Sequence, residues 1–263
     1  MQFTAVPSRQ QLTTWLSAVS GTVAPRRWFA AVLAAGTVAA MVVLAGFAGM
    51  SAAAAEPSVA LGTANAYAVL AGSAVNNTGP SVINGDLGVH PGTAVTGFPP
   101  GLVNGAVHAA DAEAAQAKSD LVIAYNDAAG RPSTAVATEL GGRTLFGGVY
   151  SNSTELGLTG TVTLDAQNDP SSVWIFQAGS TLITASNSTV ALTNGADPCN
   201  VFWQVGSSAT LGTGTDFVGT ILALTSITVQ TGTTVEGRAL ARNGAVTLDN
   251  NVFNLPTCAP PTT

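Results

Sequence analysis

The sequence predicts a mainly β protein: a β-helix of roughly triangular section with one long α-helix packed alongside it. The first observation is a four-residue pattern, T-G-T-x, whose strict or looser copies begin at positions 159, 187, 213, 231 and 249. Their separations of 28, 26, 18 and 18 residues indicate a solenoid, in which each repeat forms one coil. The second observation is that short apolar strands lie between the copies. The third is that one segment alone, residues 106–129, has the composition of a helix.

The chain begins with the layout of an export signal. The pair Arg26-Arg27 precedes an uncharged stretch, residues 28–50, and small residues follow it as far as Ala55. We therefore expect residues 1–55 to be a signal peptide cleaved after Ala55, and the arginine pair loosely resembles a twin-arginine signal. The alternative is an uncleaved anchor, because residues 28–50 are long enough to span a bilayer. The prediction is a secreted protein, or one anchored to the outer face of the cell membrane.

After cleavage, residues 56–263 would form a single domain with few charges. They hold five basic and all fourteen acidic residues, a formal net charge of −9. Only 8% of the whole chain is charged, against roughly 25% in an average soluble domain. Because the basic residues do not cluster, neither nucleic acid nor an anionic membrane surface is expected as a partner. We expect a monomer with no membrane contact once the signal is removed.

The domain is predicted to open with short strands over residues 57–105. Its β-prone segments, at 59–61, 67–70, 82–83 and 87–89, are separated by Gly, Asn and Pro, which favour turns.

The one helix is predicted over residues 106–129. Asp111 and Glu113 suit its first turn, and Gly130 and Pro132 supply its end. Its apolar stripe is mostly alanine, so we expect the helix to lie close against a flat wall. The stripe consists of Ala114, Ala117, Leu121, Ala124, Tyr125 and Ala128.

The main coils are predicted over residues 157–253. An 18-residue coil has room for three short strands and three corners, and the longer coils would carry corner insertions at 165–170 and 193–198. Alternation in three of the strands makes the residues flanking a central threonine point inward. The threonines themselves, Thr210, Thr228 and Thr247, would then form an outward row.

The chain has two cysteines, Cys199 and Cys258. An even number in an exported protein favours one disulfide, which would tie the C-terminus back to a loop. The alternative is two unpaired thiols.

Enzyme signatures are missing from the sequence. It contains no P-loop, no G-x-S-x-G motif and no H-E-x-x-H motif. Neither His90 nor His108 has paired-ligand spacing, and we expect His108 to be a hydrogen-bonded loop residue. The carboxylates are scattered, with Asp216 and Asp249 the one pair that could meet at an edge of adjacent coils. No catalytic residue, cofactor or metal is therefore predicted.

A ladder of threonines would be an ordered surface. Stacked coils place like residues about 4.7–4.9 Å apart, and a Thr-x-Thr pair adds a spacing of roughly 6.5–7 Å along the strand. The β-branch fixes χ1, so the grid of methyls and hydroxyls is preordered. Such a surface loses little entropy on meeting a repetitive solid, and ice is the natural example. Threonine is also common on exposed β faces, so the row alone does not identify the ligand.

Several longer strings run through the chain in a fixed order. They are residues 61–71 (LGTANAYAVLA), 85–89 (GDLGV), 96–98 (TGF), 124–131 (AYNDAAGR), 173–177 (VWIFQ), 202–205 (FWQV), 217–222 (FVGTIL) and 237–241 (GRALA). With these strings the chain from about Leu61 to Leu255 resembles the microbial ice-binding proteins, which have a discontinuous right-handed β-helix. The resemblance implies a secreted protein that binds ice through one flat face. Some members carry a cap insertion after the first coils. Residues 98–106 are too short for a large one.

The family's face often shows T-A/G-x-T/N motifs, and this implies a set of ice-binding residues. The segments at 93–96 and 231–234 match in full, whereas those at 213–216 and 159–162 match in part. Asp216 would put a charge on or beside the face. The predicted ice-binding residues are Thr93, Val95, Thr96, Thr159, Thr161, Thr189, Thr213, Thr215, Thr231, Thr233 and Thr234. The row of Thr210, Thr228 and Thr247 stays open as an alternative face.

The predicted function is that of an antifreeze protein, not an enzyme. It would adsorb to ice, its expected partner, and inhibit ice growth or recrystallisation. One alternative is a secreted structural or adhesive β-helix module without ice activity. The other is a carbohydrate-active β-helix enzyme.

Overall fold

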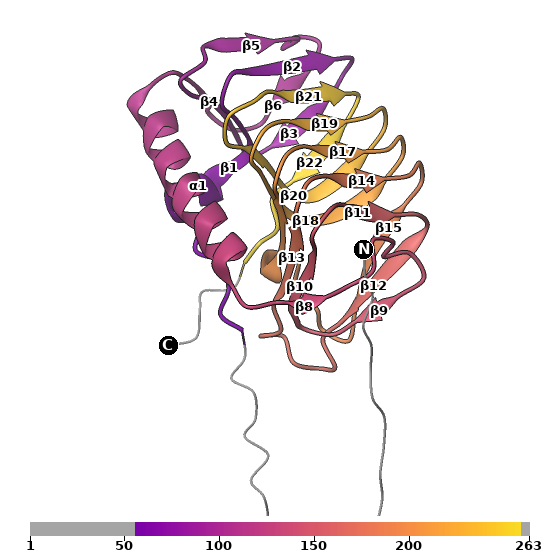
Figure 1. Cartoon of the computed structure of the whole chain (residues 1–263). Coiled ribbons are helices and arrows are strands. Elements are labelled where there is room, and N and C mark those ends of the chain that lie inside the picture. Colours follow the sequence, from indigo (N-terminus) through magenta and orange to yellow (C-terminus); the bar gives the residue numbers. More distant parts are fainter. Residues whose placement is uncertain (1–55, 259–263) are drawn as a thin grey trace, which may run out of the picture. The chain divides into compact units, whose positions relative to one another are not determined.

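The computed structural model describes residues 56–258, which form a right-handed β-helix with α1 (Ala112–Gly130) along one side (Figure 1). The predicted fold class is thereby confirmed. The predicted signal peptide, residues 1–55, lies outside the described residues. Within residues 56–258, no helix combines the length and the apolar character that crossing a bilayer requires.

One side of the β-helix is a separate parallel sheet, which we call the seven-stranded face. Its strands are, in spatial order, β11 (Leu156–Leu158), β14 (Leu182–Thr184), β17 (Ala209–Leu211), β19 (Ile227–Val229), β21 (Val246–Asp249), β2 (Ala74–Thr78) and β5 (Ala94–Thr96).

A fifteen-stranded sheet bends around the other two sides. The side that packs against α1, the helix-covered face, contains β8 (Thr134–Ala135), β10 (Gly148–Asn152), β13 (Trp174–Ala178), β16 (Val201–Val205), β1 (Tyr67–Ala71), β4 (Asp86–Val89) and β7 (Val107–Ala109). The remaining side, the third face, contains β9 (Thr144–Leu145), β12 (Thr161–Asp165), β15 (Thr189–Thr193), β22 (Val252–Asn254), β3 (Val82–Asn84) and β6 (Leu102–Val103). Strands β18 (Asp216–Ala223) and β20 (Thr234–Ala241) belong to both sides.

Two glycines let β18 and β20 turn the corner between these sides without a loop. Gly219 and Gly237 have φ values of 113° and 151°, which side-chain-bearing residues rarely adopt. A Cβ at Gly237 would also lie 2.0 Å from the carbonyl oxygen of Gly219. The earlier coils lack this device and make the same corner with loops, after β12 and β15. The predicted insertions at 165–170 and 193–198 fall in those loops, the second of which contains η2 (Pro198–Asn200).

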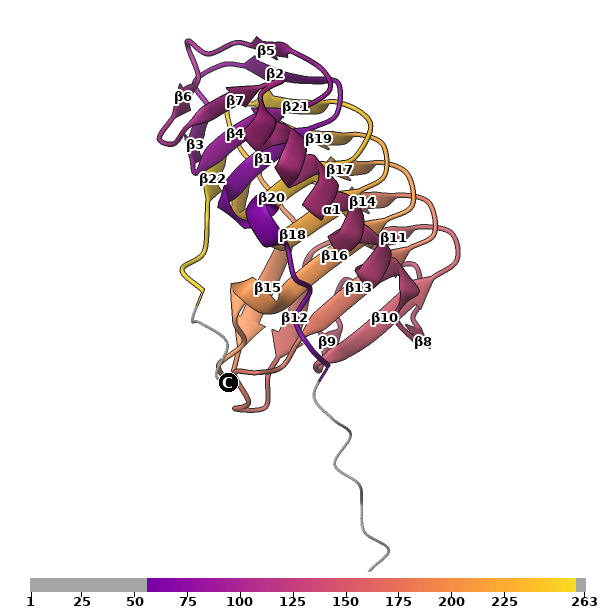
Figure 2. The ribbon, with the colours of Figure 1, turned by 90° about the vertical axis from the view of Figure 1, so that its left-hand side faces the viewer.

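The coils are not stacked in chain order. β2 pairs with β21, and β1 pairs with both β4 and the second half of β20. The two N-terminal coils therefore lie on the C-terminal coil, so the coils have the discontinuous order that the resemblance implied. Helix α1 carries the chain from this end of the solenoid to the other, as Figure 2 shows. Its 19 residues span about 28 Å, which is about six strand spacings.

The helix begins later than predicted. Residues 107–109 form β7, because they pair with β4 along the open edge of the sheet. Asp111 then caps the helix, and its Oδ1 accepts a hydrogen bond from the amide of Ala114 at 2.8 Å. Between β7 and the cap, Ala110 has a positive φ of 56°.

Apolar side chains form two clusters. The first fills the solenoid and includes an aromatic stack in which Phe176 lies 4.1 Å from Trp203, and Trp203 lies 5.2 Å from Phe217, between ring centroids. The second lies between α1 and the helix-covered face, where Leu121 packs near the outward side chain of Phe202. All six residues of the predicted helix stripe are buried, and all but Ala114 belong to this cluster. The short alanines allow the close approach that the stripe predicted.

Lys118 is buried on the same stripe, and we expect it to make stability depend on pH. Desolvation, and then the nearby charge of Arg242, lower the pKa of Lys118 to about 7. The unfolded chain, with an ordinary lysine pKa, therefore binds more protons than the native state between about pH 7 and 10. Stability should rise with pH across that window, by at most about 1.4 kcal/mol per pH unit. Urea unfolding from pH 6.5 to 9 measures the slope. Lys118→Met should flatten it, and an unchanged slope in that variant would contradict the assignment.

The predicted disulfide is confirmed: Cys199 and Cys258 are bonded, 59 residues apart in sequence. Closing a loop of this length restricts the unfolded chain, and we expect its loss to destabilise the fold by about 2–4 kcal/mol. The test compares urea unfolding of the native protein with that of the Cys199→Ser/Cys258→Ser double variant. A reducing agent should shift the first curve onto the second and leave the second unmoved. Coincident curves without reductant would show that the bond does not contribute.

Candidate functional site

The seven-stranded face presents one central row of outward side chains. The register places Thr210 beside Thr228, Thr228 beside Thr247, and Asn76 beside both Thr247 and Thr96. Neighbouring members are thus one strand spacing apart, about 4.7–4.9 Å. In spatial order, the central row is Gly157, Ile183, Thr210, Thr228, Thr247, Asn76 and Thr96.

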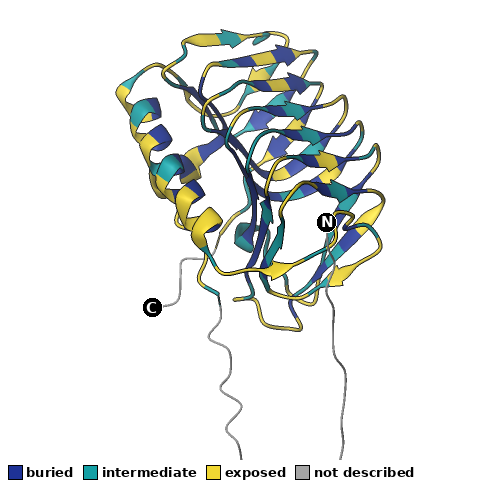
Figure 3. Ribbon diagram, in the orientation of Figure 1, coloured by how far each residue is buried: buried dark blue, intermediate teal, exposed yellow. Residues whose placement is uncertain are grey.

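A flanking row lies two residues earlier in each strand or its approach. Alternation directs it outward as well, at roughly 6.5–7 Å from the central row. Its members are Glu155, Thr181, Ser208, Ser226, Ala245, Ala74 and Ala94. Apart from Glu155 in the end coil, both rows are uncharged, small or threonine-like. Figure 3 shows exposed and half-buried positions alternating with buried ones along these strands, with no element lying over them.

The central row is available to water. Within residues 56–258, the one side-chain hydrogen bond along the row joins Thr96 Oγ1 to Asn76 Oδ1, at 3.1 Å. The hydroxyls of Thr210, Thr228 and Thr247 are therefore free to bind solvent. Ile183, 47% exposed, adds an apolar group at one end of the row. The alternation of residues 74–78 and 182–184 could have identified Asn76 and Ile183, which the sequence analysis missed.

The structure distributes the predicted ice-binding residues over several surfaces. Thr96 is in the central row, and Thr93 is exposed just before β5. Val95 instead points inward and packs against the core, because it alternates with Thr96 along the strand.

For two of the predicted residues, the expected position on the surface is wrong. Thr215 and Thr233 have no exposed area, and each donates its hydroxyl to the carbonyl of Gly212, at 2.7 and 2.8 Å. The preceding glycines, Gly214 and Gly232, have φ values of 65° and 73°, and in these two copies the left-handed turn directs the next residue inward. Thr161 stays exposed, although Gly160 before it has a φ of 76°. The same buried position is occupied in other coils by Ser188, Asn251 and Ser81. The motif is thus a corner that joins coils through buried polar groups.

The first residue of each motif lies at the border between the seven-stranded and third faces. Thr159, Thr213 and Thr231 are exposed there, but their hydroxyls are engaged. That of Thr159 contacts the Glu139 carboxylate at 3.0 Å, and that of Thr231 donates to Asp249.

Thr161, Thr189 and Thr234 lie on the third face. The register puts Thr189 and Thr234 on either side of Asp216. The next outward row carries Glu236 beside Asn254. Asn84 donates its side-chain amide to Asn254 at 2.7 Å and in turn accepts from the amide of Asn104 at 2.8 Å. Asp165 ends β12 on the outward side of the same face, so three carboxylates, Asp165, Asp216 and Glu236, interrupt it, and carboxylates bind water strongly. The helix-covered face is largely hidden, so the seven-stranded face is the large open surface whose centre is uncharged. Its carboxylates, Glu139, Glu155 and Asp249, lie at its margins.

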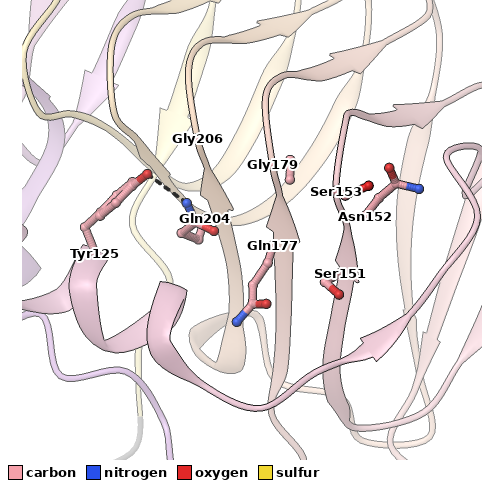
Figure 4. Close-up of a pocket in the computed structure, with 9 residues that line it drawn as sticks. Tyr125, Ser151, Asn152, Ser153, Gln177, Gly179, Gln204 and Gly206 are labelled. Carbon is pink, nitrogen blue, oxygen red and sulfur yellow. Dashed lines mark hydrogen bonds between the residues drawn. The ribbon is translucent and has the colours of Figure 1, made fainter.

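A polar groove lies beside the end of α1, between the helix and the rims of β10, β13 and β16 (Figure 4). Gln204 donates its amide to the Tyr125 hydroxyl at 2.8 Å, and Gln177 donates to the carbonyls of Ala128 and Arg131 at 2.8 and 2.9 Å. These amides fasten the helix to the sheet. The groove is lined by no carboxylate or imidazole, so it offers no general acid or base of that kind.

The two carboxylates that sequence reasoning left open as a pair do not meet. Asp216 pairs with Thr234 on the third face, whereas Asp249 follows Thr231 at the border, one coil further on. The coil of Thr231 and Thr234 separates them, so they form no acid/base pair.

The family model described as Ice-binding-like matches residues 69–254. The chain belongs to this family. An ice-binding protein from Nostoc sp. is 57% identical over 194 residues, which cover 73% of this chain and 72% of that relative. An ice-binding protein from Colwellia sp. is 39% identical over 231 residues, covering 80% and 89% respectively.

Solved structures of ice-binding-like proteins agree. The crystal structure of an ice-binding protein from an Antarctic biological consortium matches with a TM-score of 0.76 and 50% identity, over 77% of this chain and 93% of that one. The ice-binding protein of the ascomycete Antarctomyces psychrotrophicus matches with a TM-score of 0.74 and 43% identity, over 76% and 100%.

Proposed function

We propose that this ice-binding-like protein adsorbs to ice through the outer surface of the seven-stranded face, and so inhibits ice growth or recrystallisation. The observation that carries the proposal is the central row: threonine and asparagine side chains at strand spacing on an uncovered surface free of charge except near its rim. The relatives named above are ice-binding proteins, which supports the same function.

The physical basis is a preordered grid. Each threonine has a χ1 fixed by its β-branch and sits on a backbone held by parallel strands on both sides. Its methyl group orders nearby water, and its free hydroxyl anchors that water. Little conformational entropy remains to be lost when the face meets a crystal. A carboxylate would instead hold its own tightly bound hydration, which is why the third face is less suitable.

The proposal extends to the protein's setting. Ice forms outside cells, and the bonded cysteines suit an oxidising compartment, so we propose a secreted monomer that acts on ice without catalysis.

Thermal hysteresis and recrystallisation inhibition test the function. Purified protein at micromolar concentration should hold an ice crystal without growth below its melting point and keep grains small in a frozen sucrose solution. An unrelated protein of similar mass at the same concentration is the control. If the protein and the control give the same thermal hysteresis and the same grain size, the ice-binding proposal fails. The alternative, a structural or adhesive β-helix module, would then be favoured.

A further inference from the structure

A column of polar side chains is buried beneath the border between the seven-stranded and third faces. Each member immediately precedes one of the strands β15, β18, β20, β22 and β3, and the pairing of those strands places the members in consecutive coils. None of them has exposed area, and a buried polar group is costly unless it is hydrogen-bonded. In spatial order, this buried column is Ser188, Thr215, Thr233, Asn251 and Ser81.

The buried column bonds each coil to the coil before it. In four consecutive coils, a side-chain donor of the column reaches a main-chain carbonyl of the preceding coil. The pairs are Ser188 Oγ with Leu158 (2.8 Å), Thr215 Oγ1 with Ala185 (3.3 Å), Thr233 Oγ1 with Gly212 (2.8 Å) and Asn251 Nδ2 with Gln230 (2.8 Å). Ser81 continues the column in the next coil, where its hydroxyl accepts from the amide of Asn251 at 2.9 Å. One kind of link therefore recurs along the solenoid.

The accepting carbonyls lie close to the central row. Gly212 and Gln230 come two residues after Thr210 and Thr228, just past the ends of β17 and β19. Two residues of a strand span about 7 Å, so each link acts near a row residue, at the point where the sheet stops and the chain turns. The bond from Thr233 to Gly212 thus joins the coil of Thr228 to the coil of Thr210.

The links follow the polar part of the row. At one end of the solenoid, the position of the column is occupied by Gly160, and the row residue of that coil is Gly157, which has no side chain either. At the other end, Asn77 makes the link instead, and donates its amide to the carbonyl of Gly97 at 2.9 Å. Gly97 directly follows the row residue Thr96. Threonine and asparagine side chains of the row therefore lie in coils that a buried side chain joins.

We propose that the buried column positions the ice face, with Thr233 as its central positioning residue. It holds the row residues of neighbouring coils at one height and one spacing, so that the face meets ice as a plane. This inference rests on the function proposed above. A binding surface must be held to a fraction of an ångström by the residues that support it, and a hydrogen bond shielded from water is well suited to do so. The third residue of T-G-T-x, in the copies at 213 and 231, then serves ice binding from inside the protein.

Thr233→Val tests the proposal, because valine has the shape of threonine and lacks its hydroxyl. Gly212 keeps the hydrogen bond from Thr215 at 2.7 Å, so its carbonyl retains a partner. We expect thermal hysteresis at matched concentration to fall by at least about twofold. Thr233→Ser, which keeps the hydroxyl, should retain most of it. Ser188→Ala is a second variant, nearer the end of the row, and should cause a smaller loss.

Thr220→Val is the matched control. Thr220 is also buried, but it pairs with Phe202 on the helix-covered face. This variant should unfold at a temperature lower by a few degrees and keep native hysteresis. Hysteresis is measured near 0 °C, where folded variants remain folded, so a purely structural role for Thr233 would lower the unfolding temperature alone.

Native hysteresis in both Thr233→Val and Ser188→Ala would overturn the positioning role, and so would an equal loss in Thr220→Val. If the native protein itself shows no hysteresis, the ice function fails, and methyl relaxation by NMR still tests the column. The methyl groups of Thr210 and Thr228 should become more mobile in Thr233→Val and not in Thr220→Val. Unchanged mobility in Thr233→Val would overturn the column's part separately.

Discussion

Replacing Thr228 by tyrosine is expected to remove most of the thermal hysteresis while leaving the fold intact. Thr228 is half-buried in the middle of the central row, between Thr210 and Thr247. A tyrosine ring would stand above the plane and hold ice away from both neighbours. Losing even about 1.4 kcal/mol of adsorption free energy is a tenfold change in affinity, so we expect at least roughly that reduction. Nanolitre osmometry at matched concentration measures it, and the unfolding temperature should stay within a few degrees.

The matched control lies on the same coil. Thr234→Tyr makes the same substitution on the third face, between Asp216 and Val252 in the register, and should keep nearly native hysteresis. The reverse result, with activity lost in Thr234→Tyr and kept in Thr228→Tyr, would move the ice contact to the third face. That comparison decides between the two surfaces on which the predicted threonines fall.

Phe176→Ala is expected to have the largest effect on stability. The Phe176 side chain is fully buried, with its ring stacked between those of Tyr150 and Trp203 at centroid distances of 5.7 and 4.1 Å. Truncation would leave a cavity inside a solenoid whose coils cannot collapse independently. We expect a loss of about 3–5 kcal/mol in the free energy of unfolding, measured by urea denaturation.

Phe146→Ala provides the comparison for this variant. Phe146 is 46% exposed, and the hydrogen bond that it accepts from Tyr150 uses its main-chain carbonyl, which the substitution keeps. Its loss should fall within about 1 kcal/mol. Equal decreases in the free energy of unfolding of the two variants would mean that the aromatic stack stabilises the fold no more than an exposed phenylalanine does.

The sequence was sufficient for the architecture because coil period and strand alternation are local signals. Alternation along the strand placed Ile227 and Val229 inside and Thr228 outside, as the structure has them. The alanine stripe likewise predicted close packing of the helix. The burial of Lys118 in the apolar stripe could not be predicted from the helix sequence. Its ammonium donates to the carbonyls of Ala241 and Arg242, which are distant in sequence.

The candidate site was harder to predict, because the sequence motif T-G-T-x suggests that all of its threonines lie on one flat face. At the corner of residues 231–234 the left-handed Gly232 turns its successor inward, so that Thr233 is buried while Thr231 is at the rim and Thr234 is on another face. Thr161 stays exposed after the left-handed Gly160. The looser copy at Asn187 is also displaced by one residue. Asn187 itself has the positive φ that Gly214 has in the next coil, and Thr189 consequently pairs with Asp216. The T-G-T-x motif recurs regularly in the sequence, whereas the direction in which each of its side chains points depends on contacts between coils.

The interleaved order of the coils has a consequence for biogenesis. Asn76 and Thr96, at one end of the central row, lie on a strand pair that is completed only when β21 arrives, some 170 residues later in the chain. Until β21 is present, β2 and β5 have no strand through which to join the other four strands of the seven-stranded face. Such long-range pairing slows folding, and it also makes the full width of the face a property of the finished molecule alone. A chain that lacks β21 or the N-terminal coils would therefore present a shorter central row.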